Sequence, residues 1–462
     1  MLKRILNQIP ENRPIWQFGK TIYTKNDITS FILKNQNVGY KEYINKNIVL
    51  HLNNQIILSH LLVFFDGLAK NIIIIPEEID LNTGIENFNK LKIDFLIKDR
   101  TEYSELKNVN KIIDSENFFK SSSEEDEHKI SETKFLNSDC VKTKWLLATS
   151  GTTGSPKLIS HSRSSLTRTT KQNFDKGLSY CWGLMYQIAR FAGLQVFLQS
   201  FSSGSKLIFL KNENLQEDCD QLKEAGCNAI SATPTMFRKL LMGSNFSDLK
   251  LKQITLGGEI SDQKLIDKLK DAFNDTRITQ VYASTEAGVG FAVNDGYAGF
   301  PKKFLDSDLN DIQIRVSKDN ILMLKSKNSD EIEGKNFLIQ KDRDGFINSG
   351  DVVELKNGRY FFLGRLNGAI NVGGNKVHPE EVENVIKELS EVKMVSVFSK
   401  KNPILGQIVA ANIVPSTNLE VKKFKHLVIN HCKEALEDFK VPISINIVQN
   451  IGTNKSGKVI RS

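Results

Sequence analysis

The chain has 462 residues, of which 40% are hydrophobic and 25% are charged, and this balance is ordinary for a soluble globular protein. That length is sufficient for two or three compact units. The formal net charge of +8 comes from basic residues spread along the chain, with no helix-turn-helix, zinc-finger or aromatic RNA-binding signature. The composition therefore disfavours a nucleic-acid partner, and we attribute the charge to solubility.

The sequence predicts a cytoplasmic protein without a transmembrane segment. Its start lacks an extended apolar segment that ends at a small-residue cleavage site, so no secretory signal is expected. Residues 56–68 are the best membrane candidate, but this stretch is short and contains His60 and Asp66, which favours a buried helix. The five cysteines have no metal-ligand spacing and cannot all pair, as expected in a reducing compartment.

In the first 140 residues, predicted strands alternate with predicted helices, as in parallel α/β layers. Apolar runs at 48–50 and 72–75 predict buried strands, and the stretch 56–65 between them predicts a helix. The Ser-rich, acidic segment 120–134 interrupts this alternation, and its composition predicts an exposed connector.

A Gly-rich loop is expected between two short strands at 145–148 and 158–160. Its glycines let backbone N–H groups turn toward an anion, and its hydroxyls and one ammonium add donors. The residues with this chemistry are Thr149, Ser150, Gly151, Thr152, Thr153, Gly154 and Lys157. The loop therefore predicts a polyphosphate site, although a polar hairpin turn is the alternative for the segment alone. Its spacing is not that of a Walker A loop, which disfavours a P-loop NTPase.

Two further motifs follow predicted strands. Strands are expected at 254–256 and 278–282, with a helix between them that is capped by Ser261 and runs toward Phe273. The motifs Gly257-Gly258 and Thr285-Glu286 come just after these strands. Open α/β sheets bind ligands in the crevice outside the carboxyl ends of their strands, so both motifs are candidates for a binding site.

The pattern changes beyond Asn367. His378-Pro379 predicts a helix start, because proline favours the first helical turn and acidic residues follow it. Strands are then expected at 392–398 and 407–414, and a helix at 421–439. These elements predict a small α+β unit of roughly 95 residues.

Several motifs together resemble one family. The loop Thr149–Lys157 resembles the phosphate loop of the acyl-adenylate-forming superfamily, which comprises acyl- and aryl-CoA ligases, adenylation domains of peptide synthetases, and luciferases. Further resemblances follow in the family's order: Gly257-Gly258-Glu259, Tyr282 to Glu286, Ser349-Gly350-Asp351, Gly364 to Asn367, Asn371 to Lys376 with Pro379 to Glu383, and Ser456-Gly457-Lys458. The resemblance spans about residue 145 to the C-terminus. It implies an α/β fold, with a large multi-layer α/β N-terminal domain at 1–366 and a small mobile α+β C-terminal domain at 367–462, joined by a hinge.

The resemblance implies adenylation chemistry. A carboxylate must attack the α-phosphate of ATP, and two anions about 4 Å apart repel by roughly 4 kcal/mol at an effective dielectric near 20. The ammonium of Lys458 would bridge these anions, although a solvated lysine near the chain end is the alternative. Thr285 would donate its hydroxyl to the α-phosphate, and Glu286 would hold Mg²⁺.

The same resemblance implies a nucleotide site for ATP and AMP. The phosphate loop and the adenine-site loop Gly257-Gly258-Glu259 would form part of it. Tyr282 would lie against the adenine, and Asp351 would accept the ribose hydroxyls. Arg365 would make a second ribose or phosphate contact, and Lys376 would approach the phosphate.

Two half-reactions need two arrangements of one site. The resemblance implies that the C-terminal domain swings about the hinge residue Asn367 once the acyl-AMP has formed. The swing would withdraw Lys458 and present Gly373 and Gly374 beside a tunnel for the thiol arm. The family more usually has Asp or Lys at the hinge, but Asn also tolerates unusual backbone angles.

The segment from Tyr186 to Leu194 is expected to form the acyl pocket, with Arg190, Phe191 and Gly193 as tentative lining residues. It lacks the Asp that pairs with a substrate ammonium in amino-acid-activating domains, which argues against an α-amino acid. Arg190 is either the partner of an acidic or polar substrate tail or an outward-pointing residue that supports a loop.

The sequence thus predicts an enzyme that uses ATP and Mg²⁺ to convert a small carboxylic acid to an acyl-AMP and transfers the acyl group to CoA. The alternative acceptor is the phosphopantetheine arm of an acyl carrier protein. A catalytically idle nucleotide-binding scaffold is a third possibility, which the presence of Lys458, Glu286 and Asp351 disfavours.

Overall fold

A computed structural model gives the structure. It describes residues 2–37, 39–81, 88, 91–99, 108–120, 141–148, 157–211, 213–243, 245–285, 288–307, 309, 311–326, 341–416, 420–454 and 458–461. The predicted strands at 48–50, 72–75, 145–148 and 158–160 are all present. The connector predicted at 120–134 lies outside the described residues, apart from residue 120.

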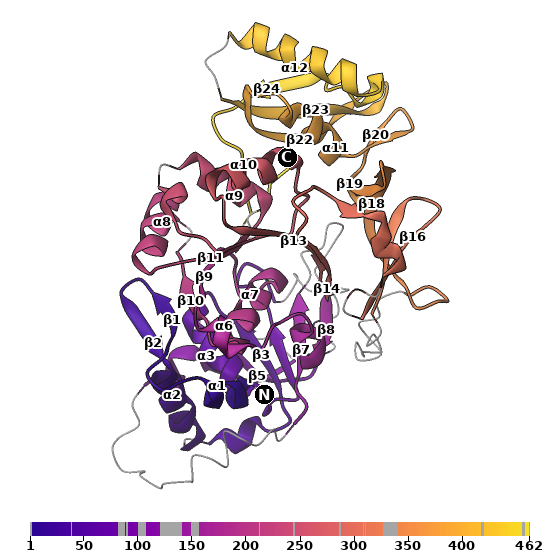
Figure 1. The fold of residues 1–462 in the computed structure, drawn as a ribbon. Coiled ribbons are helices and arrows are strands. Elements are labelled where there is room, and N and C mark those ends of the chain that lie inside the picture. Colours follow the sequence, from indigo (N-terminus) through magenta and orange to yellow (C-terminus); the bar gives the residue numbers. More distant parts are fainter. Residues whose placement is uncertain are drawn as a thin grey trace.

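Two large sheets form the body of the molecule (Figure 1). The eight-stranded sheet has parallel inner strands and antiparallel edge pairs. Its order is β14 (Gly288–Val293), β13 (Arg277–Ser284), β12 (Gln253–Gly257), β11 (Ala229–Ala232), β9 (Cys181–Leu184), β10 (Lys206–Phe209), β1 (Pro14–Phe18) and β2 (Thr21–Thr24). The six-stranded sheet has the order β6 (Val109–Asp114), β5 (Ile93–Lys98), β3 (Asn47–His51), β4 (Asn71–Ile74), β7 (Lys144–Ala148) and β8 (Leu158–Ser162).

Buried helices supply much of the core beside these sheets. The main ones are α1 (Leu2–Gln8), α2 (Lys25–Asn37), α3 (Gln55–Phe65) and α7 (Phe191–Ser202). The prediction of a buried helix after residue 55 is confirmed. Its start is fixed by Asn54, whose side chain accepts hydrogen bonds from the backbone N–H groups of Ile56 and Ile57. Because α3 is apolar on all sides, it is stable only when it is enclosed.

Other helices pack on the opposite side of the eight-stranded sheet around a second apolar core. They are α8 (Leu215–Glu224), α9 (Pro234–Met242) and α10 (Gln263–Ala272). The expected cap of α10 is wrong by one residue. Asp262, not Ser261, accepts a hydrogen bond from the Leu265 N–H, and its negative charge suits the positive end of the helix dipole.

A five-stranded antiparallel sheet follows in the chain. Its order is β15 (Phe300–Pro301), β19 (Arg359–Arg365), β18 (Ile347–Lys356), β17 (Ile321–Ser326) and β16 (Ile312–Val316). The short 3₁₀ helix η7 (Leu366–Gly368) contains Asn367 and separates this sheet from the C-terminal domain. Further short helices in the described ranges are η1 (Tyr40–Tyr43), η3 (Ser115–Phe118), α5 (Arg163–Thr167), α6 (Phe174–Gly177), η4 (Phe246–Asp248) and η5 (Lys302–Asp306).

The C-terminal domain is a sheet covered by helices and lies at the top of Figure 1. Its strands are β20 (Ile370–Val372), β21 (Asn375–Val377), β22 (Val392–Asn402), β23 (Gly406–Pro415) and β24 (Ser444–Ile447). They pack with α11 (Pro379–Lys387) and α12 (Val421–Ala435), and η8 (Asp438–Lys440) follows. The helix predicted to reach Phe439 ends earlier, since Glu437 and Asp438 are unfavourable at the negative end of a helix.

This architecture confirms the predicted fold class, a large α/β N-terminal part with a small α+β domain. Within the ranges that the structure describes, no helix combines the length and the apolar character needed to cross a membrane.

Candidate functional site

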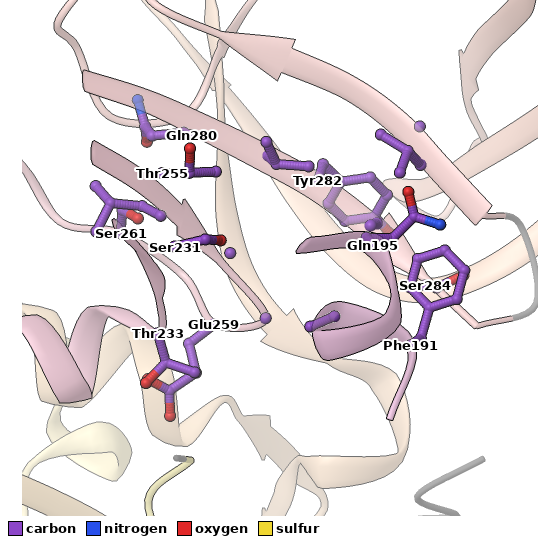
Figure 2. A pocket seen from close by; sticks show the side chains of 18 of the residues that line it. Phe191, Gln195, Ser231, Thr233, Thr255, Glu259, Ser261, Gln280, Tyr282 and Ser284 are labelled. Carbon is purple, nitrogen blue, oxygen red and sulfur yellow. The ribbon is translucent and has the colours of Figure 1, made fainter. Parts of the chain in front are cut away.

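A cavity of about 2100 Å³ lies beyond the carboxyl ends of β11, β12 and β13 and extends to the C-terminal domain. In Figure 2, Phe191 and Gln195 of α7 face Tyr282 and Ser284 of β13, and Glu259 lies beside Thr233. The predicted residues that line this cavity are Lys157, Arg190, Phe191, Gly257, Gly258, Glu259, Tyr282, Thr285, Asp351, Arg365, Asn367 and Lys458. Residues from distant parts of the sequence thus meet in the crevice where an open α/β sheet binds ligands.

Lys458 reaches into the cavity from the C-terminal domain. Its Cε lies 3.6 Å from the position that a β-carbon on Gly258 would occupy, so the lysine arm passes over this glycine. Gly258 has a φ of +82°, which a side chain would strain. Burial lowers the pKa of Lys458, while the nearby carboxylates of Glu259 and Asp351 raise it. A partly desolvated ammonium is therefore available for an anionic ligand.

Asp351 forms a polar cluster at the wall of the cavity. Its Oδ2 accepts a hydrogen bond of 2.5 Å from the Tyr282 hydroxyl, and its Oδ1 lies 3.3 Å from Nε of Arg365. Arg365 also donates to the Ser349 carbonyl at 2.7 Å. Burial and the charge of Asp351 raise the pKa of Tyr282 well above its ordinary value, so this hydroxyl stays protonated and donates. The cluster fixes a carboxylate with acceptor capacity that suits a ribose diol.

The ring of Tyr282 has aromatic neighbours of its own. It packs nearly parallel to Phe291 and Phe362, with ring centroids 5.1 Å apart in both pairs. These contacts and the bond to Asp351 hold the tyrosine in the cavity wall.

Arg190 lies in the cavity wall but has a counter-charge. Its guanidinium is 2.6 Å from Oε1 of Glu78, in a partly exposed ion pair. Phe191 follows it at the start of α7 and lines the cavity. Gly193 is not among the lining residues, because it packs against the preceding turn; a β-carbon there would lie 2.0 Å from the Gln187 carbonyl oxygen.

Another arginine in the cavity wall, Arg168, was not predicted from the sequence. It donates to the Ser326 hydroxyl at 3.0 Å and to the Val289 carbonyl, while its Nε is buried without a partner. No carboxylate in the described part of the chain forms an ion pair with it. Burial lowers the pKa of Arg168, and the nearby charge of Asp311 partly offsets this effect. The guanidinium nevertheless stays charged at neutral pH.

Hydroxyl and amide groups line the face of the eight-stranded sheet that borders the cavity. Ser231, Thr255 and Thr279 are neighbours in register on β11, β12 and β13. Gln253 donates to the hydroxyls of Thr255 and Thr279 at 3.1 Å. The cavity therefore has a polar wall in addition to its aromatic groups.

Some predicted residues lie elsewhere. Gly373 and Gly374 form the exposed turn between β20 and β21, and Lys376 is exposed on β21; none of them lines the cavity. Residues Thr149 to Gly154 of the phosphate loop and the expected magnesium ligand Glu286 lie outside the described residues. In the described ranges, no cluster of three or more His, Cys, Asp or Glu side chains could hold a metal ion.

The fold and the cavity are those of a ligand-binding α/β protein whose C-terminal domain contributes a lysine to the cavity. Comparisons with known proteins agree with this class. The model for AMP-binding enzymes matches residues 88–312, and the model for the C-terminal domain of these enzymes matches residues 381–458. The chain therefore belongs to the acyl-adenylate-forming superfamily. It is an AMP-forming ligase.

Individual relatives and solved structures that are similar to this chain have more specific names than the family. The chain is 24% identical over 351 residues to a 2-succinylbenzoate–CoA ligase of Listeria innocua, with 70% of both chains covered. It is 28% identical over 320 residues to a 3,4-dihydroxybenzoate–[aryl-carrier protein] ligase of Bacillus anthracis, with 68% of this chain and 71% of that protein covered. Its fold is similar to that of the o-succinylbenzoate CoA synthetase of Bacillus subtilis in complex with its acyl-adenylate, with a TM-score of 0.72 at 18% identity over 100% of this chain and 96% of the other.

Proposed function

We propose that this ligase activates a small dicarboxylic acid and transfers the acyl group to CoA. In the first step, one carboxylate attacks the α-phosphorus of ATP and the bond to the bridging oxygen breaks, which yields acyl-AMP and pyrophosphate. In the second step, the thiol of CoA attacks the acyl carbon and AMP leaves. The observation that carries the proposal is the convergence on one cavity of Lys458, Asp351 and Arg168, a half-buried arginine whose Nε has no partner.

Arg168 supports the choice of a dicarboxylic acid. A half-buried guanidinium with an unsatisfied Nε–H and no ion-paired carboxylate is costly, and a bidentate carboxylate would offset that cost. Arg190, the sequence-based candidate for this role, already has Glu78 as its counter-charge. The relatives named for 2-succinylbenzoate act on an acid that carries two carboxylates, which fits a site of this kind.

CoA is the acceptor that most of the named relatives share. A phosphopantetheine arm on a carrier protein remains the second candidate, because one relative is named as an aryl-carrier ligase. Free CoA at millimolar concentration separates the two acceptors. Thioester formation with CoA alone supports the first, and a strict requirement for a carrier protein supports the second.

The hinge and the tunnel are also parts of the proposal. η7 with Asn367 would be the pivot between the five-stranded sheet and the C-terminal domain. The exposed turn at Gly373 and Gly374, and Lys376 beside it, would reach the site only after the domain has rotated. Glycine at this turn would let the thiol arm pass close to the backbone.

The experiment is a pyrophosphate-exchange assay with matched mono- and dicarboxylic aromatic acids at saturating ATP. The wild-type enzyme should prefer the dicarboxylic acid. Arg168→Leu should shift that preference toward the monocarboxylic acid by roughly tenfold or more, or about 1.4 kcal/mol in discrimination. Arg190→Leu is the matched control and should leave the ratio unchanged. If Arg190→Leu alone shifts the ratio, the acid-binding role belongs to Arg190, and no shift in either variant contradicts the dicarboxylic-acid proposal.

A further inference from the structure

Glu259 links the two domains through its carboxylate. Its Oε2 accepts a hydrogen bond of 3.0 Å from the backbone N–H of Thr235, in the first turn of α9. Its Oε1 accepts one of 3.0 Å from the backbone N–H of Val459, which directly follows Lys458. One side chain thus joins the N terminus of a helix in the large domain to the segment that carries Lys458.

Glu259 holds a pair of facing segments, 453–454 and 458–459, which we call the Lys458 hairpin. Thr453 and Val459 form a β-bridge, the Asn454 N–H donates to the Lys458 carbonyl at 2.9 Å, and the Asn454 side chain accepts from the Lys458 N–H at 3.0 Å. Because this hairpin is tied internally, fixing the Val459 N–H also fixes the backbone from which the Lys458 side chain extends.

A second contact fastens the same hairpin to α9. The ammonium of Lys239 donates to the Thr453 hydroxyl at 2.9 Å. This contact involves a neutral partner on the hairpin, whereas Glu259 brings a negative charge close to Lys458. The two contacts therefore differ in their electrostatic effect on the lysine, although both hold the hairpin in place.

We propose that Glu259 is a positioning residue for the adenylation step, because its carboxylate holds the Lys458 hairpin against α9 and so keeps the lysine ammonium in the cavity. A glutamate suits this task because it offers one acceptor oxygen to each of two N–H donors. A glutamine would turn its own N–H₂ group toward one of those donors. The inference rests on the proposed function for the step that it supports, but the contact itself can be measured without any substrate.

Because Glu259 is charged, its role in positioning Lys458 should also affect the pH dependence of adenylation. The charged groups near Lys458 are Glu259 and Asp351, which raise its pKa, and Arg365 and Arg190, which lower it. Removal of the Glu259 charge should therefore lower the pKa of Lys458. The alkaline decline of the adenylation rate should then begin at a lower pH, because the ammonium is lost sooner.

The test compares Glu259→Gln with Thr453→Ala in two assays, pyrophosphate exchange across pH and thiolation of supplied acyl-AMP. Glu259→Gln should slow pyrophosphate exchange roughly tenfold to a hundredfold and move the alkaline decline of its rate to lower pH, and it should slow thiolation less than exchange. Thr453→Ala loosens the same hairpin without a change of charge, so the rate of pyrophosphate exchange should decline at the same alkaline pH as in the wild type. Equal loss of both half-reactions in Glu259→Gln, or an unmoved pH profile, would overturn the proposal.

A second variant and a substrate-free measurement keep the inference separate from the proposed function. Val459→Pro removes the N–H donor but leaves the Glu259 contact with α9 intact, and it should slow adenylation selectively. In hydrogen exchange, the Val459 amide should be protected in the wild type and should exchange at least tenfold faster in Glu259→Gln. If the Val459 amide exchanges hydrogen faster in Glu259→Gln but no acid supports catalysis, the contact is confirmed and the proposed function is wrong. If catalysis is present and the Val459 amide is equally exposed in both proteins, the inference fails.

Discussion

Removal of the Lys458 ammonium should separate the two half-reactions. In the structure, this ammonium is partly desolvated and faces the carboxylates of Glu259 and Asp351, so its loss leaves an excess of negative charge where two more anions must meet. The repulsion between a substrate carboxylate and the α-phosphate at about 4 Å is on the order of 4 kcal/mol. At 1.36 kcal/mol for each factor of ten, Lys458→Ala should slow acyl-AMP formation by roughly three orders of magnitude.

The assay for this prediction measures each half-reaction by itself. Acyl-AMP formation is followed by acid-dependent exchange of labelled pyrophosphate into ATP, and thiolation is followed by the conversion of supplied acyl-AMP to the thioester. ATP affinity and thiolation should remain within a few-fold of the wild type, because Lys458 acts in the adenylation transition state. Equal loss of both half-reactions would refute the assignment of Lys458 to adenylation alone.

Three further predictions follow from the cavity and its support. Because burial lowers the pKa of Lys458, the wild-type adenylation rate should decline at a lower pH than an ordinary lysine would give; a rate that stays constant to about pH 10.4 contradicts this. Asp351→Asn removes the charge that faces Arg365 and should raise the KM for ATP at least several-fold in initial-rate assays, with an unchanged KM as the contrary result. Gly193→Ala places a methyl group 2.0 Å from the Gln187 carbonyl and should lower the free energy of unfolding in urea by roughly 1–3 kcal/mol, whereas unaltered stability would show that the turn relaxes.

The sequence predicted best those elements whose signal is local. The buried helix after residue 55 and the Pro379 helix start were recognisable, because an apolar run and a capped first turn are encoded within a few residues. Helix ends were less certain. Ser261 and Asp262 are both good caps, and only the hydrogen bond that the Leu265 N–H donates to Asp262 decides between them.

The contacts that complete the site could not be predicted, because they join distant segments. Arg168 bonds to groups 121 and 158 residues away, and no local motif marks it. Glu259 was recognised within a glycine motif, but its partner Val459 lies 200 residues further along the chain. Likewise, the partner of Arg190 is Glu78, which is 112 residues away, so the sequence alone could not decide between a ligand-binding and a structural role.

The most direct test of the proposed function is the reaction with a dicarboxylic aromatic acid, ATP and Mg²⁺, first without CoA and then with it. An enzyme of this kind should catalyse pyrophosphate–ATP exchange that depends on the acid and proceeds without CoA, and should then form stoichiometric AMP and acyl-CoA once CoA is added. Release of ADP and phosphate in place of AMP and pyrophosphate, or exchange that requires CoA, would contradict the proposed function.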